Sequence, residues 1–279
     1  GQYVPTVTPI EIEGVDKTST DVQGATQTGT PTFNTTATNL NGDKIAVTPS
    51  AEYPAKLVDP ATGRTTDATS VTVAGEGTYT INPSTGEVTF TPEPSFTGKA
   101  KGVEVTLSAP VGRNKDGKIQ EEYIKTATAK YTPTVVGVTP TATPAETKDI
   151  QGATQTGKPE FKGGTVEVNG VEKTVEINED VPATFDDGST TKTVEGVGKF
   201  TVAADGTVTF VPEPNFVGTA PAVTVVREDK NGTKASATYT PTVVGVTPTA
   251  TPAETKDVQG ATQTGKPEFK GGTVTVDGV

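Results

Sequence analysis

The side chains that could do chemistry in this chain bear oxygen and not sulfur or imidazole. The sequence contains no Cys, His, Met or Trp. Without Cys or His, neither a Ser-His-Asp relay nor a thiolate or HExxH zinc site can form. Carboxylates, amides and hydroxyls remain, which support acid-base catalysis by paired carboxylates, cation binding or side-chain crosslinking.

Two acidic pairs are candidates for acid-base work or cation binding, Glu179 with Asp180 and Asp186 with Asp187. Catalysis requires such groups to meet in a cleft beside a substrate. Neither pair has an evident counterpart in the first half of the chain. We therefore interpret both as solvated acidic loops.

Two further stretches partly resemble calcium loops, Asn114–Gly117 and Asp229–Gly232. A calcium loop needs several oxygen ligands at fixed spacing, and neither stretch supplies the remaining carboxylates. The Gly in each accepts the positive φ that a tight hairpin requires. Both are interpreted as hairpin turns, and Asn169-Gly170 is likewise expected to form the turn of a tight hairpin.

Glu93 and Glu213 each lie between two prolines and shortly before a Phe that we expect to be buried. A glycosidase would need a second carboxylate about 5–10 Å away. A carboxylate at such a corner can instead accept hydrogen bonds from backbone N–H groups. Because the motif recurs, we expect this structural role.

Glutamines recur beside threonines, at Gln23, Gln27, Gln151, Gln155, Gln259 and Gln263. Thr-Gln ester and Lys-Asn isopeptide crosslinks occur in some proteins, so crosslinks are an open alternative. A Lys-Asn crosslink would need equivalent partners in each repeat, but Lys158 corresponds to Thr30. The sequence thus assigns no catalytic, cofactor-binding or metal-binding residue.

These candidates must be judged against an internal repeat. Tyr131–Val171 and Tyr239–Val279 differ at only three positions, Ile150/Val258, Glu167/Thr275 and Asn169/Asp277. A weaker copy opens the chain, because Tyr3–Val7 and Asp21–Gly29 match Tyr131–Val135 and Asp149–Gly157. A residue that recurs in each unit is first a part of the building block.

Short alternating runs between turn signals predict half-buried strands. In the first repeat these runs are Lys44–Thr48, Ala55–Val58, Ser70–Val73, Thr78–Ile81, Glu87–Thr91, Val103–Leu107 and Tyr123–Tyr131. Tyr53, Tyr79 and Tyr123 are expected mostly in the core. Seven such runs fit an all-β sandwich.

Proline recurs every few residues in Gly137–Lys148, which favours an extended, stiff path and predicts a spacer. The domain organisation is expected to be 1–13, the end of a preceding repeat and a linker; 14–136, a longer first repeat; 137–148, a Pro-rich linker; 149–244, a second repeat; and 245–279, a linker and the start of a third repeat. We expect the sandwich-like repeats to be joined end to end. Ordered residues in 245–279 would dock on the second repeat or on a neighbouring molecule.

A net charge of −11 argues against nucleic acid and anionic lipid as partners. The sequence shows no signal peptide or membrane span. Because position 1 is not Met, we expect an internal piece of a longer protein.

The blocks Gly77–Gly98 and Gly198–Gly218 share the pattern Gly-x-Val-Thr-Phe-x-Pro, and each precedes an Ala-x-Tyr-Thr-Pro-Thr-Val strand. With the Pro-rich joint and the long period, they resemble the CshA-type fibril repeats of streptococcal surface adhesins. The resemblance implies an extracellular, cell-wall-anchored fibril that presents a separate adhesive region.

We therefore predict a non-enzymatic stalk or spacer that uses no cofactor or metal and whose partner is the neighbouring repeat. The alternative is that the repeats themselves bind a host extracellular-matrix protein or another bacterium, through the longer hairpin around Asn114–Tyr123. An extracellular carbohydrate-active enzyme is a third possibility, for which no acid-base groups gather outside the repeated scaffold.

Overall fold

The computed structural model describes residue 2, residue 4 and residues 8–278. The weaker repeat copy at Tyr3–Val7 therefore lies largely outside the described residues. Contacts divide the chain into two units: unit 1 contains residues up to Val138 together with Thr165–Val175, and unit 2 contains Thr139–Gly164 together with Glu176 onward. Both units are built from strands, and none of the described residues forms a helix long and apolar enough to cross a membrane.

Unit 1 consists of short antiparallel strands with one parallel pairing. Its strands are β1 (Ile12–Val15), β2 (Lys17–Val22), β3 (Gln27–Gly29), β4 (Thr32–Thr38), β5 (Lys44–Ala46), β6 (Ala55–Asp59), β7 (Arg64–Thr65), β8 (Ser70–Val73), β9 (Gly77–Ile81), β10 (Val88–Pro92), β11 (Gly98–Lys99), β12 (Val103–Pro110), β13 (Ile124–Val136), β18 (Gly164–Val168) and β19 (Val171–Val175). A short 3₁₀ turn, η1 (Glu121–Tyr123), precedes β13.

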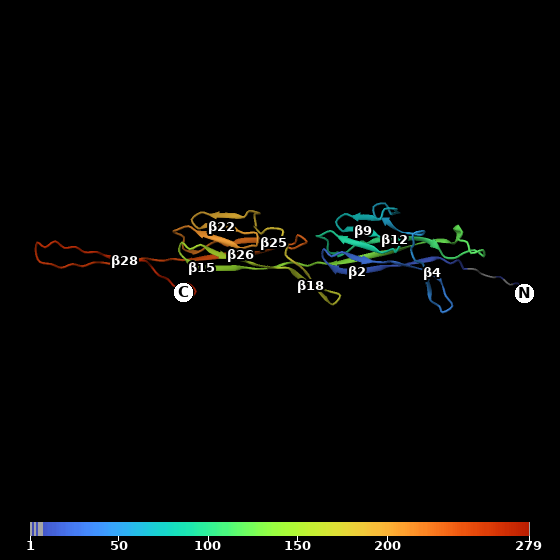
Figure 1. The fold of residues 1–279 in the computed structure, drawn as a ribbon, viewed down its shortest axis with the longest axis horizontal. Coiled ribbons are helices and arrows are strands. Elements are labelled where there is room, and N and C mark those ends of the chain that lie inside the picture. The colour runs from blue at the N-terminus through green and yellow to red at the C-terminus, as the bar shows by residue number, and fades with distance from the viewer. Residues whose placement is uncertain (1, 3, 5–7, 279) are drawn as a thin grey trace. The chain divides into compact units, whose positions relative to one another are not determined.

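Two sheets of unit 1 face each other across its core. One has the strand order β3-β10-β9-β8, and the other has the order β11-β13-β12-β6-β7 with β2 parallel to β13. Figure 1 shows β9 and β12 in separate layers. Buried and exposed residues alternate along β12, which is the period-2 pattern of a strand with one face on the core.

Aromatic side chains join the two layers of unit 1. Tyr79 stacks on Phe90 with ring centroids 4.6 Å apart and meets Tyr131 edge-on at 6.4 Å. All three rings are fully buried. Gly29 leaves room for Tyr131, because a Cβ at position 29 would lie 2.2 Å from that ring. This predicted core is therefore confirmed for Tyr79, whereas Tyr53 only packs at its margin.

Unit 2 repeats this arrangement. Its strands are β14 (Thr141–Thr143), β15 (Ala145–Ile150), β16 (Gln155–Gly157), β17 (Glu160–Lys162), β20 (Thr184–Phe185), β21 (Thr191–Val194), β22 (Gly198–Val202), β23 (Val208–Pro212), β24 (Gly218–Thr219), β25 (Val223–Glu228), β26 (Lys234–Val244), β27 (Thr249–Thr251) and β28 (Glu268–Lys270). The sheets run β16-β23-β22-β21 and β15-β26-β25-β20. Phe200 stacks on Phe210 and meets Tyr239 edge-on at 6.5 Å.

The all-β sandwich prediction is confirmed, and each of the seven predicted runs overlaps a strand. The expected spacer at 137–148 has more structure than a stiff extended path: β14 pairs with β17, and β15 runs parallel to β26. Its prolines flank these edge strands, where a missing N–H is tolerated.

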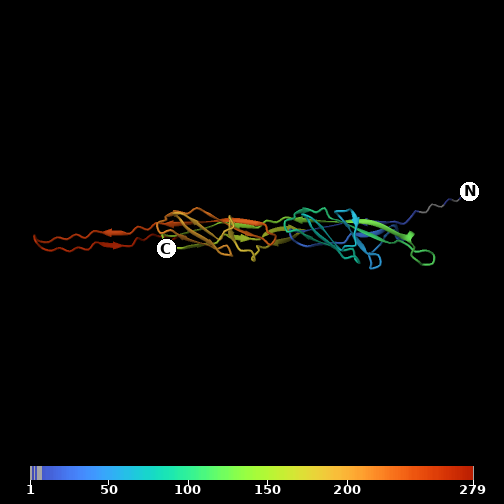
Figure 2. The same ribbon diagram turned by 90° about the horizontal axis from the view of Figure 1, so that it is seen from above.

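The third copy forms a thin ribbon in which β27 pairs with β28. All residues of both strands are exposed, so this pair adds nothing to the core of unit 2. Figures 1 and 2 show the pair standing away from the sandwich of unit 2.

Candidate functional site

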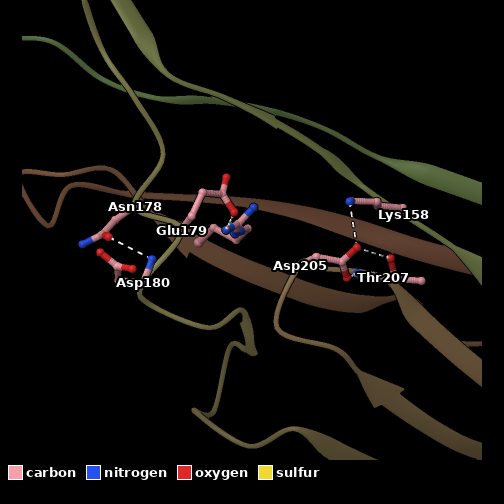
Figure 3. A network of polar contacts seen from close by, with 7 residues as sticks. Lys158, Asn178, Glu179, Asp180, Asp205 and Thr207 are labelled. Atoms are coloured by element: carbon pink, nitrogen blue, oxygen red, sulfur yellow. Dashed lines mark hydrogen bonds and ion pairs between the residues drawn. The ribbon is translucent and has the colours of Figure 1, made fainter.

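The first acidic pair lies in a turn of unit 2. Glu179 Oε2 is 2.8 Å from Nη2 of Arg227, while the backbone N–H of Asp180 donates to Asn178 Oδ1 at 3.1 Å. Figure 3 shows that Glu179 and Asp180 take different partners. The two carboxylates therefore do not share a site.

The second acidic pair surrounds one lysine. Lys192 contacts Asp186 and lies 3.5 Å from Asp187. Hydrogen bonds from Ser189 hold the pKa of Asp187 below its usual value, and the Asp186 carboxylate raises the pKa of Lys192. Across the described part of the chain, no three His, Cys, Asp or Glu residues gather in a way that could hold a metal ion.

The repeated glutamates hold backbone groups at the Pro-Glu-Pro corners. Glu93 Oε1 accepts from the Gly75 N–H at 2.9 Å, and Glu213 Oε1 accepts from the Gly196 N–H at 3.2 Å. This is the structural contact predicted for both.

The two loops that partly resemble calcium sites also turn their oxygens toward the backbone. Asn114 Oδ1 accepts from the N–H groups of Asp116 and Lys118, at 3.0 and 2.9 Å. Asp229 Oδ1 accepts from the N–H groups two and four residues further on, at 2.8 and 2.9 Å. Gly117 and Gly232 have φ near +75° and +79°. Both loops are hairpin turns.

One glutamine of each repeat belongs to a polar cluster beside the core tyrosine. Ser19 Oγ lies 2.6 Å from Gln27 Oε1 and 2.7 Å from Tyr131 Oη, and Gln27 Nε2 donates to the Thr134 carbonyl. The same contacts recur among Thr147, Gln155, Tyr239 and Thr242. In the third copy, Thr255 donates to Gln263 at 2.6 Å. Covalent Thr-Gln crosslinking stays an open alternative.

Lys158, considered for an isopeptide bond, pairs instead with Asp205 at 2.9 Å. This hydrogen bond, with those from Thr207, holds the pKa of Asp205 well below its usual value. Figure 3 shows Lys158, Asp205 and Thr207 together. The ion pair borders a hollow of about 700 Å³ in unit 2, which Glu179 and Arg227 also line.

The burial of Arg227 and Asp229 was not predicted from the sequence. They occupy the inward positions that Leu107 and Ala109 fill in unit 1. Arg227 Nε and Asp229 Oδ2 are buried atoms without a hydrogen-bond partner among the described residues. Aligning the two repeats along the alternating positions Val223, Val225 and Arg227 would have shown that these two polar residues occur in the second repeat alone.

The site with the strongest packing argument is a surface of unit 1 on which one hairpin docks. We call this surface, which contains Val22 and Val138, the seat. The hairpin is β18–β19, whose predicted Asn169-Gly170 turn is confirmed by positive φ angles of 51° and 77°. Val168 and Val175 of the hairpin are buried against Val22 and Val138. Apolar side chains thus form a small satellite core away from the main one.

Polar contacts frame this seat. Asn169 Nδ2 donates to the Thr20 carbonyl at 3.2 Å, and Lys173 Nζ lies 3.7 Å from Asp21 Oδ1. Next to Val22 in the chain, Gln23 Nε2 donates to the Pro94 carbonyl at 2.8 Å. The sequence predicted the turn at Asn169 but not what the hairpin packs against.

Comparison with known proteins decides what these repeats are. The family model described as the surface adhesin CshA repetitive domain matches residues 9–135 and 137–243. The chain belongs to the CshA surface adhesin repeat family. Its two matched ranges are tandem repeats, and as members of this family they are parts of a surface adhesin.

Solved structures include a near relative of one segment. The NMR structure of repeat domain 13 of the fibrillar adhesin CshA from Streptococcus gordonii is 55% identical over 24% of this chain and 86% of that one, with a TM-score of 0.16. Mouse cadherin-23 EC22-24 is 13% identical, covering 85% of this chain and 65% of that one, with a TM-score of 0.28. Protocadherin gamma B7 domains 1-4 are 10% identical, over 94% and 59%, with a TM-score of 0.29.

This chain thus spans less than two thirds of either cadherin chain. No curated protein matches it. The second CshA match contains β18–β19, although the contacts of that hairpin lie in unit 1. The sequence repeat and the packed unit therefore have different boundaries.

Proposed function

We propose that the two repeats are non-enzymatic spacers in the stalk of a cell-wall-anchored fibrillar adhesin. One observation carries this proposal: the path of the chain through unit 1. Glu11 Oε1 lies 3.5 Å from Lys125 Nζ, so the chain enters beside the start of β13. It leaves directly after Val136, at the other end of that strand.

The advance through one repeat follows from strand geometry. β13 contains 13 residues, and at about 3.3 Å per residue it spans about 40 Å. In unit 2, β15 and β26 have the same parallel pairing, from Ala145 opposite Tyr239 to Ile150 opposite Val244. Each repeat thus carries the chain forward by roughly its longest strand, which is what a spacer requires.

The contacts of the carboxylates considered for catalysis support this proposal, because these groups accept backbone hydrogen bonds at turns or form local ion pairs. Surface charge contributes as well. A net charge of −11 disfavours association between neighbouring, nearly identical repeats.

Small-angle X-ray scattering of the whole chain tests whether the lengths that the two repeats span add up. We expect a radius of gyration of about 30 Å for a spacer, against about 19 Å for a compact globule of this length. The smaller value would contradict the spacer proposal and favour binding by the repeats themselves.

The binding alternative concerns the longer hairpin of the first repeat. None of the residues of its 3₁₀ turn, η1, is buried, so removal of this hairpin should leave the core intact. Shortening Asn114–Tyr123 to the length of the loop at Asp229–Gly232 should leave cell adhesion by the parent adhesin unchanged. Loss of adhesion with unit 1 still folded would assign binding to the repeat.

A further inference from the structure

The seat for β18–β19 in unit 1 has an open counterpart in unit 2. Ile150 and Val246 correspond in the repeat to Val22 and Val138. Val22 and Val138 are 8% and 6% exposed, whereas Ile150 is 43% exposed. Val246 is likewise only partly buried. Two valines that lie under a hairpin in unit 1 thus have more exposed equivalents in unit 2.

The polar frame of the open seat is already in place. Gln151 Nε2 donates to the Pro214 carbonyl at 2.9 Å, as Gln23 does to Pro94 in unit 1. The Val246 N–H donates to Gln151 Oε1 at 3.3 Å, the same length as the bond from Val138 to Gln23. The seat therefore forms without a docked β18–β19 hairpin.

Unit 2 contains only part of a hairpin that could fill this seat. The third copy reaches Val276, the equivalent of Val168, and turns at Asp277-Gly278 with positive φ angles of 48° and 85°. The printed sequence ends at Val279, the equivalent of Val171, so residues matching Glu172–Val175 are not part of it. Val276 is partly buried, whereas Val168 is 4% exposed.

Among the described residues, the tip of the β4–β5 hairpin has no such seat. Leu40 of the β4–β5 hairpin corresponds to Val168 and is 107% exposed. Ile45, on the second strand, is 49% exposed. An apolar side chain at this position is thus exposed in the β4–β5 hairpin and buried in the β18–β19 hairpin.

We propose that the Ile150/Val246 seat is a docking surface for a complete β18–β19-type hairpin of a further repeat in the same chain. The argument is continuity with the occupied seat of unit 1. Seat residues Val136–Val138 and the first hairpin strand both lie within the duplicated stretch, so seat and hairpin are copied together. This inference concerns how repeats join and does not depend on the spacer role.

The test completes the third hairpin in the full chain by adding Glu-Lys-Thr-Val, a copy of Glu172–Val175, after Val279. Tethering gives the hairpin a high effective concentration at its seat. Amide hydrogen exchange, followed by NMR at Val246, should slow at least tenfold and approach the rate at Val138. A matched control carries the same extension with Val276→Asp, which should abolish this slowing.

The occupied seat serves as the internal reference. Val168→Asp in the unextended chain should speed exchange at Val138 at least tenfold while leaving the core of unit 2 unaffected. Unchanged exchange at Val246 on extension, or at Val138 in Val168→Asp, would overturn the proposal. Protection of Val246 that rises with protein concentration in the unextended chain, and is lost in Leu40→Asp, would assign the seat to a second molecule instead.

Discussion

Unit 1 buries the hydroxyl of Tyr79 against the carboxylate of Glu76, whereas unit 2 has Phe200 and Val197 at these positions. Glu76 also accepts from the Lys101 N–H at 2.8 Å. The ring at this position makes the same stacked contact in both units, at 4.6 and 4.5 Å. The buried Tyr79 hydroxyl is tolerated because its partner, Glu76, is present, and unit 2 lacks both the hydroxyl and the carboxylate.

The opposite exchange occurs one sheet away. In the alignment of the two repeats, Leu107 and Ala109 of unit 1 correspond to Arg227 and Asp229 of unit 2. Arg227 forms an ion pair with Glu179. Each repeat thus carries buried polar groups that the other lacks. The scaffold depends on the shared aromatic layer, and the polar groups are local variations upon it.

The shared layer is expected to give the largest effect. Phe210→Ala removes a fully buried ring that stacks on Phe200, and such truncations cost about 3–5 kcal/mol. Phe90→Ala is the matched change in unit 1. Urea unfolding followed by NMR signals of Val225 and Val105 should show that each variant destabilises its own unit. Equal losses in both units would mean that the two cores unfold together.

Breaking the Glu76–Tyr79 pair should have the next largest effect. Glu76→Val introduces the residue of unit 2 but leaves the buried Tyr79 hydroxyl without its acceptor, at a cost of about 1–3 kcal/mol. Adding Tyr79→Phe should recover much of this loss. A double-mutant cycle in urea unfolding measures the coupling, and additive losses would argue against a specific pair.

Alkaline pH should separate the two units further. Burial and the Glu76 carboxylate raise the pKa of Tyr79, and burial raises the pKa of Tyr131 and Tyr239. Unfolded tyrosines ionise at about pH 10, so the stability that these groups contribute below that pH is lost as the pH rises above it. With two such tyrosines against one, unit 1 should lose about 1.4 kcal/mol per pH unit more than unit 2.

Tyr79→Phe gives this alkaline prediction its control. In that variant, the free energies of unfolding of the two units should fall in parallel between about pH 10 and 11. Urea titrations at each pH measure the slopes. A steeper slope for unit 1 that persists in the variant would assign the difference to other groups.

The smallest effect is expected at the Lys158–Asp205 pair, which unit 1 lacks. Lys158→Thr introduces the residue found at Thr30, and an exposed pair contributes less than about 1 kcal/mol at neutral pH. Because the pKa of Asp205 is lowered in the folded state, its contribution exists above about pH 4 and is lost as pH falls. The variant should therefore weaken the acid dependence of unit 2, measured by urea unfolding at pH 7 and pH 3.

Much of the fold could be predicted because period-2 alternation and turn residues are local signals. The strands at Thr78–Ile81 and Glu87–Thr91 were found this way, as was the turn at Asn169-Gly170. The early strands β2 and β3 were missed because they are polar or short, and their partners lie about sixty residues or more away in the chain. Prolines near β15 similarly concealed this strand, which pairs with β26.

The site was less predictable than the fold. Repetition identified Glu93 and Glu213 as structural, and their backbone contacts bear this out. Nothing local to β18–β19 says that Val168 packs on Val22, because that contact joins residues of different repeats. An alignment of the units would have found Arg227, whereas the seat required three-dimensional contacts.

The parallel pairing of β2 with β13 has a mechanical consequence. β2 carries the chain into unit 1 and β13 carries it out, and the two strands share six paired positions from Lys17–Tyr131 to Val22–Val136. A pull on the two ends of the repeat draws these strands past each other along their length. The hydrogen bonds between them are then loaded in shear and together, instead of opening one at a time from an end. The strand that gives the repeat its length is therefore also the one that resists its extension.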